Sequence, residues 1–321
     1  MSKYLKHFET TSEYESYIGG GAVLPNVSYT EDTLKVYYNP IQHDYSQDYF
    51  TMVVTVGGDV TWAGTGNNAL YYSKDNGTTW SEPSVNIILS VNEGDKVLWK
   101  GGTSPIDEEG IGVFNGSTDV RYTVEGNVMS LLFGDVFKGQ TSLEDKNYVF
   151  NNLFYNNKGL TSAENLSLPA TTLADDCYYA MFYGCINLVY APKVLPATTL
   201  AFECYCYMFR NCTSLVTTPE LPAPTLTYNC YSEMFEGCTS LVTTPELPAT
   251  TLTDGCYQQM FSGCTKLNHI KCLATNISAS SCLWNWVKNV ASTGTFVKAS
   301  SMASWPTGTS GIPSGWTVVD A

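Results

Sequence analysis

The clearest pattern along the chain is a set of hydrophobic positions that recurs four times between residues 168 and 272. Each copy starts with Leu-Pro-Ala, and the copies begin 27, 26 and 26 residues apart, at Leu168, Leu195, Leu221 and Leu247. At fixed offsets each then carries a Cys, a Tyr, an apolar residue followed by Phe, a second Cys and a Leu. A period of this length with recurring Leu predicts a solenoid, in which each unit buries its apolar face against its neighbours.

Within one copy, the pattern predicts an extended segment followed by a short helix. Pro245 and Pro248 exclude a helix in the first part of the copy. Thr253 or Asp254 is placed to cap a helix from about residue 255 to residue 262. Where this helix ends, we expect a residue with the left-handed backbone conformation, which Gly and Asn adopt most readily. The four copies have Gly184, Asn211, Gly237 and Gly263 at this position.

The aromatic and sulfur positions of the repeats predict the core. We expect each Phe to stack on its counterpart one repeat away; these are Phe182, Phe209, Phe235 and Phe261. The second Cys of each copy is expected in the same core, at Cys185, Cys212, Cys238 and Cys264. The total of eleven cysteines is odd, which favours buried thiols that pack as small hydrophobes over a disulfide framework. Zinc is the weakest alternative, because the spacing C-x7-C lacks the close ligand pairs of zinc sites.

The remaining segments predict β structure before the repeats and a cap after them. Residues 1–48 are expected to form an N-terminal attachment module with a short helix and a β-hairpin. Residues 49–138 are expected to form a β-sandwich, because short apolar runs with turn signals between them follow one another. The predicted strands are Phe50–Val56, Ala69–Ser73, Val85–Leu89 and Lys96–Lys100. The solenoid is expected over 139–290, and residues 291–321 as a C-terminal cap that lays aromatic residues over the last unit.

Composition narrows the function classes. Only 14% of the residues are charged and the net charge is −14, which opposes binding to nucleic acid or to an anionic membrane. No run of apolar residues is long enough for a transmembrane helix. We also see no apolar segment typical of a secretory signal at the start of the chain.

The repeats resemble the BspA-like leucine-rich repeats, a subclass found on bacterial, protozoan and phage-encoded surface proteins. The residues that carry the resemblance are Met234-Phe235-Glu236-Gly237-Cys238-Thr239-Ser240-Leu241 and its copies, which cover about half of the chain. The paired prolines and the extra Cys at the start of each predicted helix depart from the family pattern. The segment from Trp284 to Trp316 and the opening Leu24–Tyr29 more loosely resemble modules that surround such repeats in gut Bacteroides and their phages. The resemblance implies adhesion and ligand binding rather than catalysis.

Three patterns are candidates for catalysis or metal binding, and we favour a structural explanation of each. Ser73–Trp80 fits the Asp-box pattern S-x-D-x-G-x-T-W, which is a hairpin turn in sialidase-like propellers and occurs here once. The acidic run Asp107–Glu109 suits calcium, but a solvated loop explains it better. His269 and Cys272 could form a catalytic dyad, but the repeat pattern already accounts for both residues. We therefore expect no catalytic residue, no cofactor and no metal ion.

The predicted ligand-binding surface is the outward face of the extended segments. It consists of Tyr190, Val216, Thr218, Glu220, Val242, Thr244, Glu246, Asn268, Ile270 and Lys271. If the ligand is a glycan, an exposed aromatic ring should supply a stacking platform, and the candidates are Tyr190, Tyr228 and Trp305. The alternative is that the Thr and Val positions only fill the surface.

These observations predict a non-enzymatic recognition protein that binds a bacterial surface glycan or protein through the solenoid. A phage virion surface or tail component is favoured, with the N-terminal module contacting other structural subunits. The alternatives are a Bacteroides cell-surface adhesin and, on the strength of the Asp box, a carbohydrate-binding accessory or glycoside hydrolase component. A homotrimer would suit a fibre-like virion protein, but no residue pattern specifies one.

Overall fold

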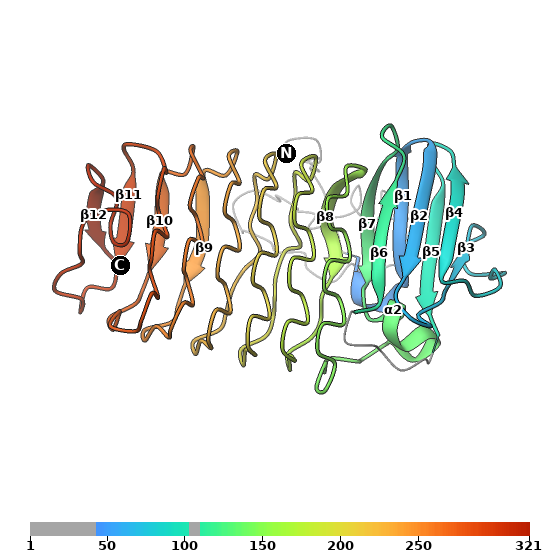
Figure 1. Cartoon of the computed structure of the whole chain (residues 1–321), viewed down its shortest axis with the longest axis horizontal. Coiled ribbons are helices and arrows are strands. Elements are labelled where there is room, and N and C mark those ends of the chain that lie inside the picture. The colour runs from blue at the N-terminus through green and yellow to red at the C-terminus, as the bar shows by residue number, and fades with distance from the viewer. Residues whose placement is uncertain (1–42, 103–109) are drawn as a thin grey trace, which may run out of the picture. The chain divides into compact units, whose positions relative to one another are not determined.

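The computed structural model describes residues 43–102 and 110–321, and Tyr45–Ala321 form one mostly β unit (Figure 1). Two predictions lie outside the described residues. One is the N-terminal helix and hairpin, which fall within residues 1–42, and the other is the acidic run Asp107–Glu109. The first half contains η1 (Tyr45–Gln47), β1 (Phe50–Val56), β2 (Gly58–Gly64), β3 (Leu70–Ser73), β4 (Asn86–Val91), β5 (Lys96–Gly101), β6 (Gly112–Gly116), β7 (Arg121–Asn127), α2 (Ser130–Phe133) and η2 (Gly134–Val136). The second half contains β8 (Leu160–Ser167), β9 (Thr243–Leu247), β10 (His269–Cys272), β11 (Thr295–Lys298) and β12 (Thr317–Asp320).

Strands β1 to β7 lie in two sheets whose inner faces share an aromatic core. The larger sheet has the order β3-β5-β1-β7-β8 and the smaller has the order β4-β2-β6. Phe114 of β6 contacts Phe50, Trp62 and Trp99, with ring centroids 5.5, 4.6 and 5.1 Å apart. The four strands predicted in this region are confirmed as β1, β3, β4 and β5.

The larger sheet continues into the repeats, because its last strand, β8, belongs to residues 139–290. β8 pairs in parallel with β7, whereas β1, β3, β5 and β7 pair with one another in antiparallel fashion. Phe154 lies just before β8 and stacks on both Phe114 and Phe182, at 5.7 and 5.4 Å. One continuous hydrophobic core therefore runs across the boundary expected at residue 138.

After β8 the chain forms a series of coils, each of which lies against the next (Figure 1). Four of them match the four sequence copies, at 168–194, 195–220, 221–246 and 247–272. On one side of the coils, β9, β10, β11 and β12 form a parallel sheet in that order. The segment 291–321 therefore adds two strands to this sheet in addition to the aromatic cover that was predicted.

The part of each coil expected to be helical is instead a row of tight turns. The N–H of Cys230 donates to the carbonyl of Thr227 in its own coil, whereas the N–H of Tyr231 donates to the carbonyl of Cys256 in the next coil. This alternation continues along the row, and every fourth residue has a positive φ, as at Asn229 (51°), Glu233 (55°) and Gly237 (73°). An α-helix accommodates neither feature. The helix predicted over 255–262 is therefore wrong, because half of the N–H groups bind the neighbouring coil.

The repeated aromatic residues form columns through the coils, as predicted. Ring centroids are 5.2 Å apart for Phe182–Phe209, 5.5 Å for Phe209–Phe235 and 5.7 Å for Phe235–Phe261. A second column consists of Tyr178, Tyr205, Tyr231 and Tyr257. Each repeat buries both rings on neighbours of the same kind, which fixes the register between coils.

The cysteines lie in the same core as free thiols. All eleven are buried and unpaired with one another. Cys185 and Cys212 donate from Sγ to the carbonyls of Phe154 and Phe182, both at 3.0 Å, and Cys238 and Cys264 donate to those of Phe209 and Phe235, both at 3.1 Å. The interpretation of the cysteines as small buried groups is confirmed, and these four thiols also link successive coils.

Candidate functional site

The predicted ligand-binding face is present only in part. Tyr190, Val216 and Val242 are 43%, 44% and 43% exposed. The other exposed members are Glu220, Glu246 and Asn268, and Lys271 is half-buried in an ion pair with Glu246 at 2.7 Å. Thr218 and Thr244 are half-buried instead of outward, and the hydroxyl of Thr244 is enclosed. The strict alternation that the prediction assumed is absent from these segments.

Ile270 was predicted on the surface and is fully buried, so this part of the prediction is wrong. The register between β9 and β10 shifts there, with Lys271 opposite Glu246 and Cys272 opposite Leu247. Between the pairs His269–Thr243 and Lys271–Glu246, β10 has one residue fewer than β9. Ile270 therefore takes an inward position next to Cys272.

Of the three aromatic platforms expected for a glycan, two are exposed. Tyr190 is 43% exposed, and Tyr228 is 50% exposed and stacks on Phe202 at 5.4 Å. Trp305 is only 9% exposed and stacks on Trp286 at 6.0 Å. The prediction of Trp305 as a platform is wrong, because the ring closes the end of the hydrophobic core.

The Asp-box segment is a local turn. Asp75 accepts hydrogen bonds from the hydroxyl and the N–H of Thr79, at 2.6 and 2.9 Å, and from the hydroxyl of Ser73 at 2.7 Å. These bonds, first that of the Thr79 hydroxyl, lower the pKa of Asp75 to about 2. Trp80 follows the turn, packs edge-on against Tyr49 and lies under the Lys100 ammonium at 4.2 Å. The carboxylate of Asp75 is thus committed to the turn.

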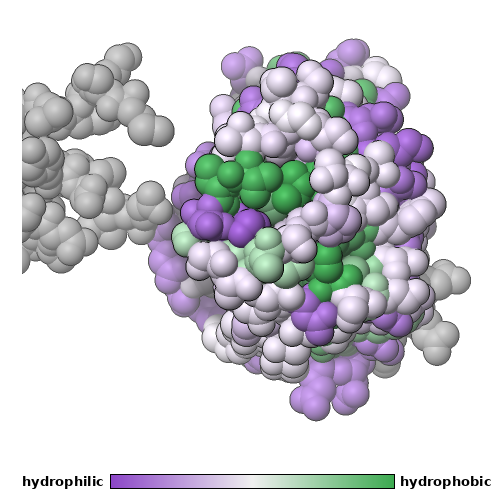
Figure 2. Space-filling view, turned by 90° about the vertical axis from the view of Figure 1, so that its left-hand side faces the viewer, coloured by the Kyte–Doolittle hydropathy of each residue, from purple (hydrophilic) through white to green (hydrophobic). Residues whose placement is uncertain are grey.

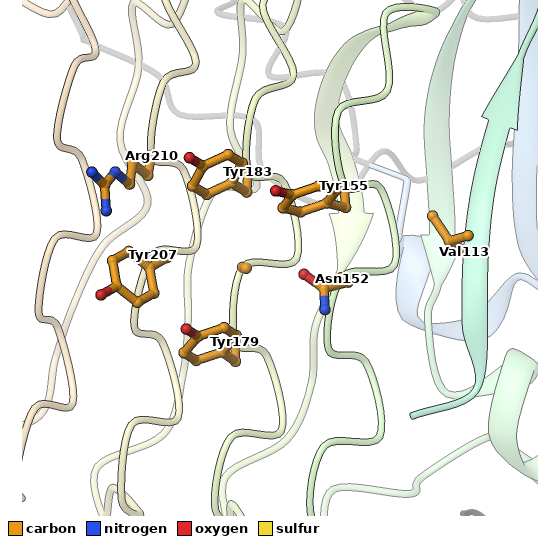
Figure 3. A pocket seen from close by; sticks show the side chains of 8 residues that line it. Val113, Asn152, Tyr155, Tyr179, Tyr183, Tyr207 and Arg210 are labelled. Atoms are coloured by element: carbon orange, nitrogen blue, oxygen red, sulfur yellow. The ribbon is translucent and has the colours of Figure 1, made fainter. Parts of the chain in front are cut away.

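A hollow that the sequence did not reveal lies over the turn rows at the start of the coils (Figure 3). It has a volume of about 530 Å³ and is lined by Val113, Asn152, Tyr155, Tyr179, Ala180, Tyr183, Tyr207 and Arg210. Val113 comes from β6, and the others come from three successive coils. Figure 3 shows Tyr155, Tyr183 and Arg210 in one line along the coils and Asn152 and Tyr207 in another.

The hollow exists because one position in a column of side chains is small. This column consists of equivalent residues from successive coils, each with a left-handed φ between 49° and 59°. They are Asn152, Ala180, Tyr207, Glu233, Gln259 and Asn285. Ala180 carries only a methyl group, whereas its neighbours in this column, Asn152 and Tyr207, carry larger polar side chains. Ala180 lines the hollow together with Tyr179 and Tyr183, so the two rings stand beside the space that a larger side chain at residue 180 would fill.

The rings around the hollow are held by one another. Tyr155 and Tyr183 are stacked at 4.9 Å with an interplanar angle of 17°. Tyr179 meets Tyr207 edge-on at 5.2 Å. Burial raises the pKa of Tyr179 to about 12, so its hydroxyl keeps its proton and remains a hydrogen-bond donor at neutral pH.

Arg210 closes one end of the hollow, and two carboxyl groups neutralise it. Its guanidinium lies 5.2 Å from the ring centre of Tyr207 and forms ion pairs with Glu233 and with Glu236, the latter at 3.0 Å. Burial, followed by a hydrogen bond with Glu233, raises the pKa of Glu236 to about 7. Tyr207 donates to Glu233 at 3.2 Å. The cation at this end of the hollow is therefore already paired.

The hollow presents aromatic faces, hydroxyl groups and one amide group. The two carboxyl groups bind each other and Arg210, whereas a glycoside hydrolase holds its pair apart on two sides of a sugar. Cys206, whose carbonyl accepts from the N–H of Ala180, is the thiol beside the hollow, and burial raises the pKa of that thiol, so it is not an activated nucleophile. Among the residues that the structure describes, His, Cys, Asp and Glu do not gather in groups of three or more that would hold a metal ion.

A different comparison of the repeats would have pointed to this site. The prediction used the positions at which the copies agree, and these form the core. Tyr183, Arg210 and Glu236 occupy one slot and Ala180, Tyr207 and Glu233 another, and in both slots the copies disagree. Positions that vary between otherwise equal repeats are those that packing leaves free.

Comparison of the chain with protein-family models, with curated proteins and with solved structures gives no match. Within 43–102 and 110–321, none of the helices has the length and apolar composition needed to cross a bilayer.

Proposed function

We propose that this chain is a non-enzymatic recognition protein whose coils form a leucine-rich-repeat type of solenoid and hold a ligand in the hollow around Ala180. The observation that carries this proposal is the hollow itself, which is lined by four tyrosines and a paired arginine. Ligand sites are concave, with aromatic walls and a few placed polar groups. Tyr155 and Tyr183 brace each other, so a ligand need not order them on binding.

The repeated packing supports the solenoid. The Phe and Tyr columns and the thiol–carbonyl bonds recur from coil to coil with the period of the sequence. The parallel sheet β9-β10-β11-β12 continues the same relationship at the end of the chain. In a solenoid, each unit is stabilised by its neighbours and presents its variable positions on an extended surface.

The place of action that we favour is the surface of a phage virion, where the protein would bind a glycan or protein on a bacterial cell. A Bacteroides cell-surface adhesin and a carbohydrate-binding accessory protein use the same site and remain alternatives. They differ in where the protein resides. Its detection in purified virions favours the first, and detection on the bacterial envelope favours the second.

Binding of the labelled full chain to intact gut Bacteroides cells, across strains with different capsules, tests the recognition function. We expect strain-dependent binding that is lost in Tyr155→Ala and retained in Val242→Arg, which instead alters an exposed residue of the strand face, the outward face of the extended segments. The opposite result would place the site on the strand face that the sequence predicted. Absence of binding to every strain would contradict the recognition function.

A further inference from the structure

We propose that the hollow takes one uncharged pyranose residue of a glycan, with a face of the sugar ring against Tyr155. This inference rests on the proposed function and names the ligand class of the same site. Its basis is the combination of an exposed stacked tyrosine, a small floor and a neutralised charge cluster (Figure 3).

The ring of Tyr155 is the stacking platform. It is 40% exposed, and the ring of Tyr183 supports it at 4.9 Å. One face of a pyranose ring presents mainly C–H groups, which are apolar and pack on the face of an aromatic ring. The tyrosine pair is already in place, so little side-chain entropy is lost when a sugar packs there.

The polar groups around the hollow suit hydroxyl groups. Asn152 offers both a donor and an acceptor, and the phenol of Tyr179 both donates and accepts. A ligand that covers these groups must satisfy them, since burying a polar group without a hydrogen-bond partner lowers affinity. A sugar carries hydroxyl groups around its whole rim and meets this demand, whereas a hydrocarbon ligand does not.

The charges argue for an uncharged residue. Arg210 is the cation at the hollow, and Glu233 and Glu236 already bind it. An acidic sugar would have to compete with both carboxyl groups, and the chain as a whole carries a net charge of −14. A glycan whose bound residue is uncharged meets neither obstacle.

Enlarging Ala180, the small residue at the floor of the hollow, tests whether a ligand occupies this space. The chain itself shows which larger residue the backbone accepts there. Gln259 occupies the same place two coils beyond Tyr207 with φ 49°, nearly the value of Ala180 at 50°. Ala180→Gln should therefore fold and fill the hollow. Tyr190→Ala is the matched control, since it removes a tyrosine that is 43% exposed on the strand face.

The experiment titrates the full chain with the methyl glycosides of glucose, galactose, mannose, fucose and N-acetylglucosamine, and with methyl glucuronide, by calorimetry and saturation-transfer NMR. We expect at least one uncharged glycoside to bind and the glucuronide to bind ~10-fold or more weakly, a difference of about 1.4 kcal/mol. Tyr155→Ala and Ala180→Gln should each weaken binding by ~10-fold or more, and Tyr190→Ala should leave it unchanged.

Three results would overturn the inference: no uncharged glycoside binds, the glucuronide binds as tightly, or Tyr190→Ala abolishes binding while Ala180→Gln does not. The cell-binding assay separates this failure from that of the proposed function. If cells still bind in a manner that depends on Tyr155, recognition stands and the ligand belongs to another class. If cell binding is absent too, both fail.

Discussion

A Cβ atom placed on Gly237 would lie 2.4 Å from Oδ1 of Asn211, its counterpart in the preceding coil. The two residues are both left-handed, with φ of 73° and 61°. Gly237→Ala should therefore lower the free energy of unfolding by ~2–4 kcal/mol, which combines the cost of a left-handed alanine with that of displacing the Asn211 side chain. Urea denaturation measures this change.

Gly263→Ala is the matched control for that prediction. Its φ is 76°, but a Cβ there meets only the backbone of Gly237, at 3.5 Å. We expect a loss of ~1–2 kcal/mol, from the left-handed conformation alone. Adding Asn211→Gly to Gly237→Ala removes the clashing side chain, so the double variant should lose only as much unfolding free energy as Gly263→Ala does. Equal losses at both glycines would contradict the contact.

Phe235→Ala should cost ~3–5 kcal/mol, because it removes a fully buried ring that contacts Phe209 and Phe261 at 5.5 and 5.7 Å. Phe202→Ala is the control: it also breaks a stack, with Tyr228, but Phe202 is 43% exposed. We expect it to cost less than ~1 kcal/mol. Similar melting temperatures for the two variants would show that the column at Phe235 is not the main stabilising contact.

Stability should fall as the pH rises through the range in which Asp176 ionises. Burial, followed by Glu203, raises the pKa of Asp176 from 3.8 to about 6. The folded state therefore binds this proton more tightly than the unfolded chain does, and the cost of ionisation is absent below about pH 4 and complete above about pH 6. Asp176→Asn removes this cost.

At pH 8 we expect Asp176→Asn to gain ~1 kcal/mol, which is the full linkage value of ~3 kcal/mol reduced for access of water. At pH 3.5 it should match the unaltered chain. Glu144→Gln, which removes a carboxyl group from an exposed residue, is the control for a change of net charge alone. A gain for Asp176→Asn that is the same at both pH values would argue against ionisation as its cause.

The thiols should react slowly with a thiol reagent in the folded protein, and all eleven should react after unfolding. All eleven are buried, and burial raises the pKa of Cys272 to about 12 and that of Cys264 likewise. A thiol reagent should label few of them at pH 8 and all eleven in denaturant, without prior reduction. Fewer than eleven in denaturant would reveal disulfides.

The sequence was sufficient where it repeats itself. Phe235 and Cys238 recur because each must fit its own copy in the next coil, so their agreement encodes the packing. The strand Phe50–Val56 was also predicted with its exact bounds, since its apolar run has clear turn signals after it. Both successes depend on burial, which restricts residue type strongly.

The sequence was insufficient where hydrogen bonds, rather than burial, decide the conformation. Residues 255–262 carry the spacing of an amphipathic helix, but their N–H groups divide between their own coil and the next. Ile270 faces inward because one strand is a residue shorter than its neighbour. The hollow at Ala180 arises from the absence of a side chain, which no motif marks.

The N–H groups of the turn rows bond alternately within their own coil and to the next coil, and this pattern allows the chain to change length by whole coils. Each row donates half of its bonds forward and accepts an equal set from behind. A whole coil can therefore be deleted or duplicated, and the two rows that become neighbours still match donor for acceptor. Proteins built in this way can lengthen in steps of about 26 residues, moving their ends apart while the site near β6 keeps its geometry.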